Sequence, residues 1–119
     1  MKWYLATIVY RIICGSGDHT AQFDEQVRLI SAGDELHALY KARQIGEREE
    51  DHFLNSIHKP VLWKFVDVSE LHVVEELSDG IEIYSRIREE ADPGNYIRGI
   101  RLRAAILSES SVNSSINSN

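Results

Sequence analysis

The first thirty residues alternate in a way that predicts two paired strands. Residues 3–14 are apolar at nearly every position and rich in β-branched and aromatic side chains, which is typical of a strand covered on both faces. Residues 22–30 are predicted as a second strand, with Gly15, Gly17 and Asp18 between the two. These turn residues predict a hairpin with a wide loop, in which the glycines supply positive φ angles.

A helix is predicted to follow the hairpin. Ser31 and Asp34 have the spacing of a capping box, and helical periodicity continues to about Leu54. Glycine inside a helix costs about 1 kcal/mol relative to alanine. We therefore interpret Ala42 and Gly46 as small residues that let this helix lie close to a sheet. The other members of its inward stripe are Leu39, Ile45, Glu49 and Phe53.

Three further strands are predicted in the second half of the chain. Residues 61–68 alternate so that Trp63 and Phe65 would share one face, while Leu62, Val66 and Val68 would share the other. Residues 71–77 and 81–87 flank the pair Asp79-Gly80, which is a strong short-range signal for a hairpin.

A final helix is predicted after these strands. Asp92 and Pro93 match an N-cap followed by a first-turn proline. The apolar stripe of this helix would consist of Ile97, Ile100, Ala104 and Leu107.

The element order β-β-α-β-β-β-α predicts a single α+β domain over residues 1–107. Its sheet would be mostly antiparallel, with about five strands, one long helix packed on a face and a C-terminal helix. Residues 108–119 are mostly serine and asparagine and predict a disordered tail. Two helices cannot easily cover both faces of such a sheet, so we expect a homodimer that stacks sheet on sheet.

Charge and cysteine content narrow the class of protein. The 13 cationic and 19 acidic residues give a net charge of −6, which disfavours binding to nucleic acid or to an anionic membrane. The lone Cys14 cannot form an internal disulfide, so we expect a reducing, cytoplasmic environment. Arg11 interrupts the first apolar run and argues against a secretory signal.

Five arginines near the C-terminal helix allow two interpretations. They are either a solvated face or a small patch for anion binding or subunit contact. The five are Arg86, Arg88, Arg98, Arg101 and Arg103.

The first loop carries residues that could support chemistry. Cys14, His19 and Asp18 include a nucleophile, a base and an acid. However, adjacent Asp18 and His19 are poorly placed to act on each other in an extended loop. Together with Asp24 and Glu25, His19 and Asp18 offer enough donors for a metal, but their spacing matches no zinc or calcium pattern. We therefore expect no metal and no cofactor.

Two charged residues stand out because they interrupt apolar patterns. Arg11 lies within the first strand and Glu49 on the inward stripe of the long helix. A buried charge is costly unless it is paired. We expect Arg11 to pair across the hairpin with Asp24 or Glu25, and Glu49 to meet an arginine or a Trp or Tyr donor on the sheet. The alternative is a polar site in which a perturbed carboxylate acts as acid or base.

Several spaced segments over roughly the first 90 residues resemble the bacterial family known as domain of unknown function 4288. The resemblance implies a small bacterial cytosolic protein and supplies no catalytic residue. The segments are MKWYLATIVYRIICGSGDHTAQFDEQVRLISA, KARQIGEREEDHF, VLWKFVDVSEL and LSDGIEIYSRI.

Three functions remain open from the sequence. The first is a non-catalytic, homodimeric module that binds a protein or a small ligand. The second is a small enzyme with a pocket between the first loop and the long helix. The third, by analogy, is an inhibitor or immunity-type protein for a basic partner. The candidate site residues are Arg11, Asp18, His19, Glu25 and Glu49.

Overall fold

The predicted N-terminal hairpin is present in the computed structural model of the chain, which describes residues 1–117 and side chains up to residue 111. Strands β1 (Lys2–Cys14) and β2 (Gln22–Ala32) pair antiparallel, with Tyr4 opposite Ile30. Gly15 and Gly17 adopt φ angles of 60° and 86°, which confirms their predicted role in the turn.

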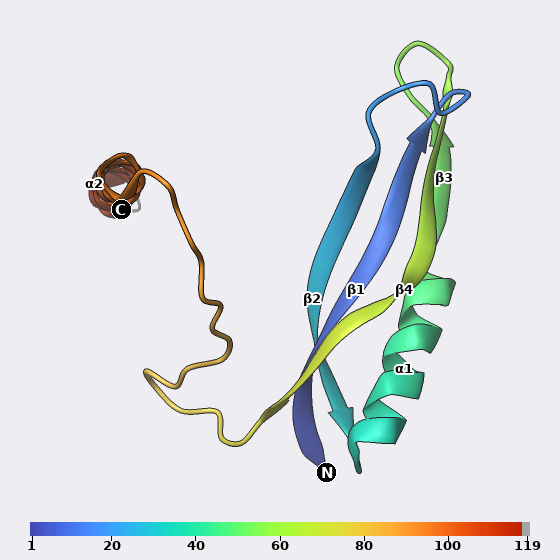
Figure 1. Cartoon of the computed structure of the whole chain (residues 1–119), viewed down its shortest axis with the longest axis horizontal. Helices are drawn as coiled ribbons and strands as arrows, with labels where there is room; N and C mark the ends of the chain where they lie inside the picture. Colours follow the sequence, from blue (N-terminus) through green and yellow to red (C-terminus); the bar gives the residue numbers. More distant parts are fainter. Residues whose placement is uncertain (118–119) are drawn as a thin grey trace. The chain divides into compact units, whose positions relative to one another are not determined.

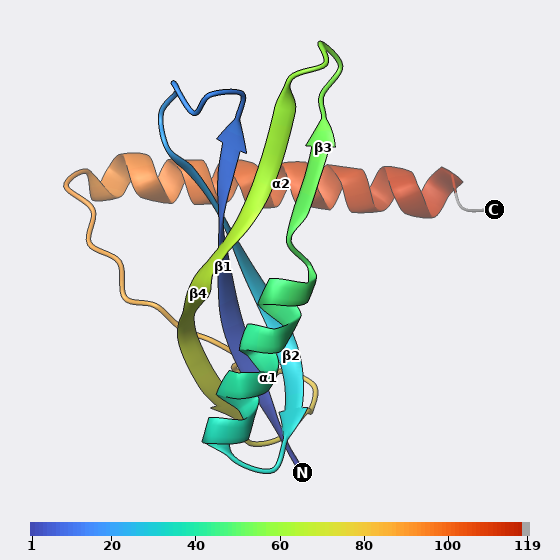
Figure 2. The same ribbon diagram turned by 90° about the vertical axis from the view of Figure 1, so that its right-hand side faces the viewer.

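One helix covers one face of the sheet. Helix α1 (Glu35–Arg48) lies across the strands in Figure 2, and its buried residues are Ala38, Ala42 and Gly46. The prediction of a capping box at Ser31 was wrong. Asp34 is the N-cap, because its Oδ1 accepts a hydrogen bond from the N–H of His37 at 2.9 Å.

The helix is shorter than predicted, because the segment expected to be its last turn forms a strand. Strand β3 (Asp51–Leu54) pairs with the beginning of β4 (Pro60–Val74). Within this pair the Phe53 ring stacks on Trp63 with centroids 5.8 Å apart. Strand pairing and ring contact thus replace the helical continuation that local periodicity favoured.

Strand β4 contains both the third predicted strand and part of the fourth. Its pairing with β1 shifts twice, which leaves Val66 and Ser69 as extra residues in two β-bulges. Phe65, Val68 and Leu71 therefore all pack against the core. The prediction that Val68 faces away from Phe65 was wrong, because the bulge between them changes the alternation.

The sheet has four antiparallel strands in the order β2-β1-β4-β3 rather than about five (Figure 1). Asp79-Gly80 does form a turn, with Gly80 at φ 82° and the N–H of Ile81 donating to Ser78 O at 3.2 Å. Residues 81–88 nevertheless form no strand. Part of this segment still lies beside β4, where the Tyr84 and His72 rings have centroids 5.2 Å apart.

The core lies between α1 and the inner face of β1. Tyr4, Ala6, Ile8 and Tyr10 alternate along this strand and are each at most 4% exposed. Gly46 of α1 sits against the Phe65 ring, where no side chain fits. This confirms the predicted close approach of helix and sheet.

The chain divides into two compact units, of which the first ends at Ser85. The single domain over residues 1–107 stays a prediction. The second unit contains α2 (Pro93–Asn117). Its predicted N-cap is confirmed, since Asp92 Oδ1 accepts from the N–H of Asn95 at 3.0 Å. The helix extends into the segment predicted as a tail, whose last two residues lie outside the described part of the chain. Among the described residues, no helix is both long enough and apolar enough to cross a membrane.

Candidate functional site

The five candidate site residues do not converge. Tyr10 points toward α1, so its neighbour Arg11 projects from the opposite face, which we call the open face. Glu25 alternates with Asp24 and lies on the open face too, whereas Asp24 faces α1. Arg11 is exposed, and within residues 1–111 it forms no ion pair. The expected cross-strand pairing of Arg11 is therefore not formed.

His19 holds the first loop rather than facing a reaction site. Its Nε2 accepts a hydrogen bond from the backbone N–H of Cys14 at 3.0 Å. Its Nδ1 is 2.8 Å from the carbonyl oxygen of Thr20, so this nitrogen carries the proton and donates it. Asp18 accepts from Ser16 Oγ at 3.1 Å. The imidazole thus contacts the backbone of Cys14 rather than activating its thiol.

Glu49 pairs with an arginine, as expected from its position on the inward stripe. Arg28 Nη1 lies 2.6 Å from Glu49 Oε2, joining β2 to the residue that caps α1. Arg28 also donates to Gln26 Oε1 from Nε and Nη2, at 3.2 and 2.6 Å. Gln26 Nε2 in turn donates to Asp24 Oδ2 at 2.7 Å, and Trp63 Nε1 reaches the same oxygen at 3.1 Å.

This polar network between β2 and α1 was not predicted from the sequence. The available signal was the alternation of Asp24, Gln26 and Arg28, which places all three on one face of a strand. Tyr10 lies beside the network and donates its hydroxyl proton to Gly46 O at 2.8 Å. Burial, together with the charge of Glu49, raises the pKa of Tyr10. The network therefore consists of satisfied structural contacts.

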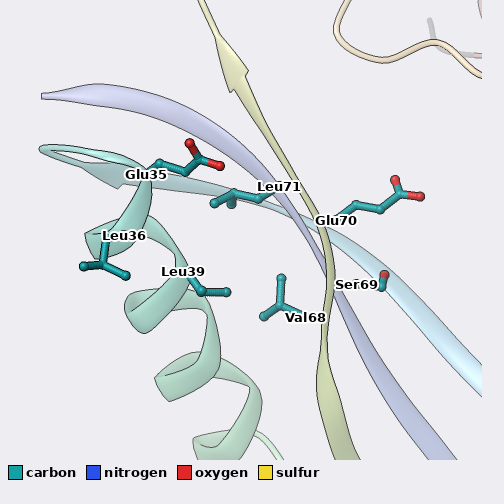
Figure 3. A pocket seen from close by; sticks show the side chains of 7 residues that line it. All are labelled: Glu35, Leu36, Leu39, Val68, Ser69, Glu70 and Leu71. Atoms are coloured by element: carbon teal, nitrogen blue, oxygen red, sulfur yellow. The ribbon is translucent and has the colours of Figure 1, made fainter.

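An apolar groove lies between the first turns of α1 and the second bulge of β4. Its volume is about 430 Å³. Figure 3 shows Leu39 and Val68 pointing toward each other across it, with Glu35 at its rim and Glu70 directed away from the helix. The groove has no converging polar groups, so it is suited to an apolar side chain rather than to a reaction. Sequence reasoning missed it, because the bulge that opens it is not visible in the residue pattern.

The open face presents large apolar side chains to solvent. On β2, Phe23, Val27 and Leu29 are 54%, 63% and 48% exposed, and Trp3 of β1 is 42% exposed. Leu29 lies directly opposite Leu5, and Val27 opposite Thr7. In the first unit α1 covers only the other face of the sheet (Figure 1). Singly exposed apolar residues are common in proteins, but a group on neighbouring strands indicates an interaction surface.

The outer edge of β2 adjoins this face. Among the described strands β2 pairs only with β1, so the other edge of its 11 residues has no strand partner. An unpaired edge presents backbone N–H and C=O groups to any strand that can align with them. The open face and the free edge thus adjoin each other along β2.

The arginines of the second unit are partly engaged within that unit. Arg88 Nε lies 2.6 Å from Glu90 Oε1, and its guanidinium group is 5.5 Å from the centroid of the Tyr96 ring. Arg103 Nε donates to Gly99 O at 3.4 Å. These contacts favour a solvated face over an anion site.

Comparison with known proteins identifies a family without identifying an activity. In residues 1–117, no three side chains among His, Cys, Asp and Glu gather closely enough to hold a metal ion. Neither the curated proteins nor the solved structures contain a match. A family model described as "Domain of unknown function (DUF4288)" matches residues 3–85, which end where the first unit ends. The chain belongs to this family of domains of unknown function.

Proposed function

We propose that the protein is a non-catalytic interaction module that acts as a homodimer in the cytoplasm. The observation that carries this proposal is the open face, where Phe23, Val27 and Leu29 of one strand are each about half exposed or more. Fully burying an exposed apolar side chain contributes roughly 1.5–3 kcal/mol, so covering the exposed half of one of these contributes about half as much. A second copy brings an identical surface, and self-complementary contacts of this kind are the commonest form of assembly.

The arrangement of the polar residues supports binding rather than catalysis. A catalytic pocket would need a base, an acid and a substrate site within hydrogen-bond reach of one another. Arg11 and Glu25 lie on the open face, Glu49 is paired with Arg28 on the other side, and His19 holds the loop backbone. The single half-buried thiol of Cys14 is compatible with a reducing cytoplasm.

Two dimer geometries would use this surface. The sheets would stack open face to open face, or the β2 strands would pair edge to edge. Both would involve Leu29, because it lies on the edge strand and on the open face.

The test is the mass of the purified protein by native mass spectrometry and by sedimentation over a range of concentrations. We expect the wild type to be a dimer and Leu29→Glu to be a monomer. Tyr40→Glu is the matched control, because Tyr40 has similar exposure, 52% against 48%, and lies on α1. We expect this control to remain dimeric. A wild-type protein that is monomeric at every concentration would refute the proposal.

A further inference from the structure

The free edge of β2 limits how two copies can meet, if the protein is the homodimer proposed above. Its N–H and C=O groups are oriented outward in the plane of the sheet, where only another strand can satisfy a series of them. The strand is 11 residues long and lacks proline. Its edge is therefore competent to extend the sheet with a second β2 strand.

Symmetry restricts the register of such a pair. Two identical strands that pair antiparallel are related by a two-fold axis perpendicular to the sheet. Opposing residues must project from the same face, so the axis passes through one residue that faces its own copy. Each register is therefore defined by a single central residue of β2.

Charge excludes three of these registers. A centre at Asp24, Glu25 or Arg28 would place each of these residues opposite its own copy, and like charges directly opposite each other are destabilising. Of the registers that remain, the two centred on Gln26 and on Val27 give the longest overlap of the strands. In the Val27 register, Glu25 would face Leu29 and Asp24 would face the buried Ile30, so neither carboxylate would meet a cation.

The Gln26 register pairs complementary charges on the face toward α1, whereas on the open face Glu25 of each copy faces Val27 of the other. Counting outward from Gln26, Asp24 of one copy faces Arg28 of the other, and symmetry forms this ion pair twice. On the open face, Phe23 meets Leu29 of the second copy. Asp24 Oδ2 already accepts from Gln26 and Trp63, whereas Oδ1 receives no hydrogen bond from the described residues. That oxygen remains available to a guanidinium group.

We propose that two copies of the chain pair their β2 strands antiparallel, with Gln26 of each copy opposite Gln26 of the other. The two four-stranded sheets then form one continuous sheet, with both α1 helices on the same face. The open faces join into a single larger surface, and the exposed Phe23 and Leu29 side chains contact each other across the new strand pair.

Cysteine cross-linking tests the register directly. In a Cys14→Ser background, Gln26→Cys places two thiols on directly opposed residues, whose Cα atoms are about 4.5–5.5 Å apart, within the range that a disulfide spans. We expect mild oxidation to convert this variant to a covalent dimer. Val27→Cys is the matched control. In the Gln26 register its two thiols are displaced by two residues along the strands, so we expect no covalent dimer.

Charge exchange provides a second test. Asp24→Arg and Arg28→Asp should each weaken dimerisation about tenfold or more, because each creates two like-charge pairs across the axis. The double variant restores unlike charges and should recover most of the affinity. Circular dichroism checks that each variant is folded, since Arg28 also pairs with Glu49.

The outcomes separate this inference from the proposed function. A wild-type monomer refutes the homodimer itself. If the wild type is a dimer that Leu29→Glu dissociates, but the Gln26→Cys variant does not cross-link, the open faces stack and the edge pairing is overturned. Cross-linking of the Val27→Cys variant without cross-linking of Gln26→Cys also overturns the proposed register. Failure of the double charge variant to recover affinity counts against the Asp24–Arg28 pairing even if Gln26→Cys cross-links.

Discussion

The Tyr10 hydroxyl donates a hydrogen bond of 2.8 Å to the carbonyl oxygen of Gly46, joining the centre of β1 to the last turn of α1. The contact is possible because Gly46 has no side chain and the Phe65 ring fills the space beside it. The Tyr10 and Phe65 rings meet edge to face with centroids 6.0 Å apart. These three residues fix the distance between helix and sheet.

Gly46→Ala is expected to destabilise the first unit. The added methyl group would overlap the Phe65 ring, and overpacking of this kind typically costs about 1–3 kcal/mol. This exceeds the gain of up to about 1 kcal/mol in helix propensity. Urea unfolding followed by circular dichroism measures the change.

Gly99→Ala is the matched control for this substitution. A methyl group at Gly99 in α2 would meet no atom within 4 Å, so helix content should rise and stability should not fall. If Gly46→Ala is as stable as the wild type, the described helix–sheet contact is wrong.

Tyr10→Phe is expected to lower the free energy of unfolding at neutral pH. It should also make this free energy depend less on pH in the alkaline range. Loss of the hydroxyl leaves Gly46 O without its side-chain donor, which costs about 1–2 kcal/mol. Burial raises the pKa of Tyr10 above its usual 10.0 in the folded state. The folded protein therefore favours the protonated phenol, and this contribution is present below pH 10.0 and is lost as the pH rises through the folded-state pKa.

Urea unfolding of the wild type and of Tyr10→Phe between about pH 8 and 11 measures how the pH dependence of stability differs, because the unfolded phenol ionises near pH 10. Tyr40→Phe, at an exposed position on α1, serves as the control and should retain the wild-type slope. If the free energy of unfolding of Tyr10→Phe changes with pH as it does in the wild type, the pKa of Tyr10 is not raised in the folded state.

Asp67→Asn is expected to reduce the acid sensitivity of the fold. Hydrogen bonds from Arg43 Nε at 3.0 Å and from the N–H of Val68 at 2.8 Å hold the pKa of Asp67 below its usual 3.8. Because the pKa of Asp67 is lower in the folded than in the unfolded state, its carboxylate stabilises the folded state at pH values above the ordinary pKa. This stabilisation disappears as the pH falls through the folded-state pKa. The wild type should therefore lose its advantage over the variant as the pH falls below about 4.

The stability advantage of the wild type over Asp67→Asn should also shrink in high salt, because the Arg43–Asp67 ion pair is exposed. Unfolding curves at about pH 3 and pH 6 measure both effects. Asp79→Asn, in the exposed turn of the first unit, controls for loss of a carboxylate in general. An Asp67→Asn variant with the same pH dependence as the wild type would argue against the Arg43 contact.

His19→Ala is expected to loosen the first loop without unfolding the sheet. The side chain accepts from the N–H of Cys14 and donates to Thr20 O, and a typical hydrogen bond contributes about 1 kcal/mol. The Cys14 amide should exchange its hydrogen faster in the variant, as measured by NMR. His52→Ala, on the exposed strand β3, should leave that exchange rate unchanged. Equal protection of the Cys14 amide in both variants would show that His19 does not hold the loop.

Local signals predicted the elements that depend on neighbouring residues. The hairpin turn followed from Gly15 and Gly17, and the close approach of α1 to the sheet followed from Gly46. The expected arginine partner of Glu49 is also present, but the pair is 34% and 40% exposed, so the cost of a buried charge is not its cause. For the glycines, a single residue type has one dominant physical explanation.

Features that depend on long-range pairing could not be predicted. Phe53 was assigned to the helix because its spacing fits a helical stripe, yet pairing with Val61 and stacking on Trp63 place it in β3. Val68 was assigned to the wrong face because a bulge leaves no mark in the residue pattern. Neither expected partner of Arg11 pairs with it. The observed register places Asp24 on the opposite face of the sheet, and it places Glu25 opposite Val9, with Phe23 opposite Arg11.

The bulge at Ser69 also determines where β4 tolerates a change in length. Val68 and Leu71 face α1 with two residues between them, whereas regular alternation allows one. Deleting Ser69 would therefore restore regular alternation and leave both side chains facing inward. Deleting Leu71 instead would require the strand to realign before an apolar residue could replace it in the core. Within a sheet whose register is otherwise fixed, Ser69 marks a position where a one-residue deletion preserves the pattern of buried side chains.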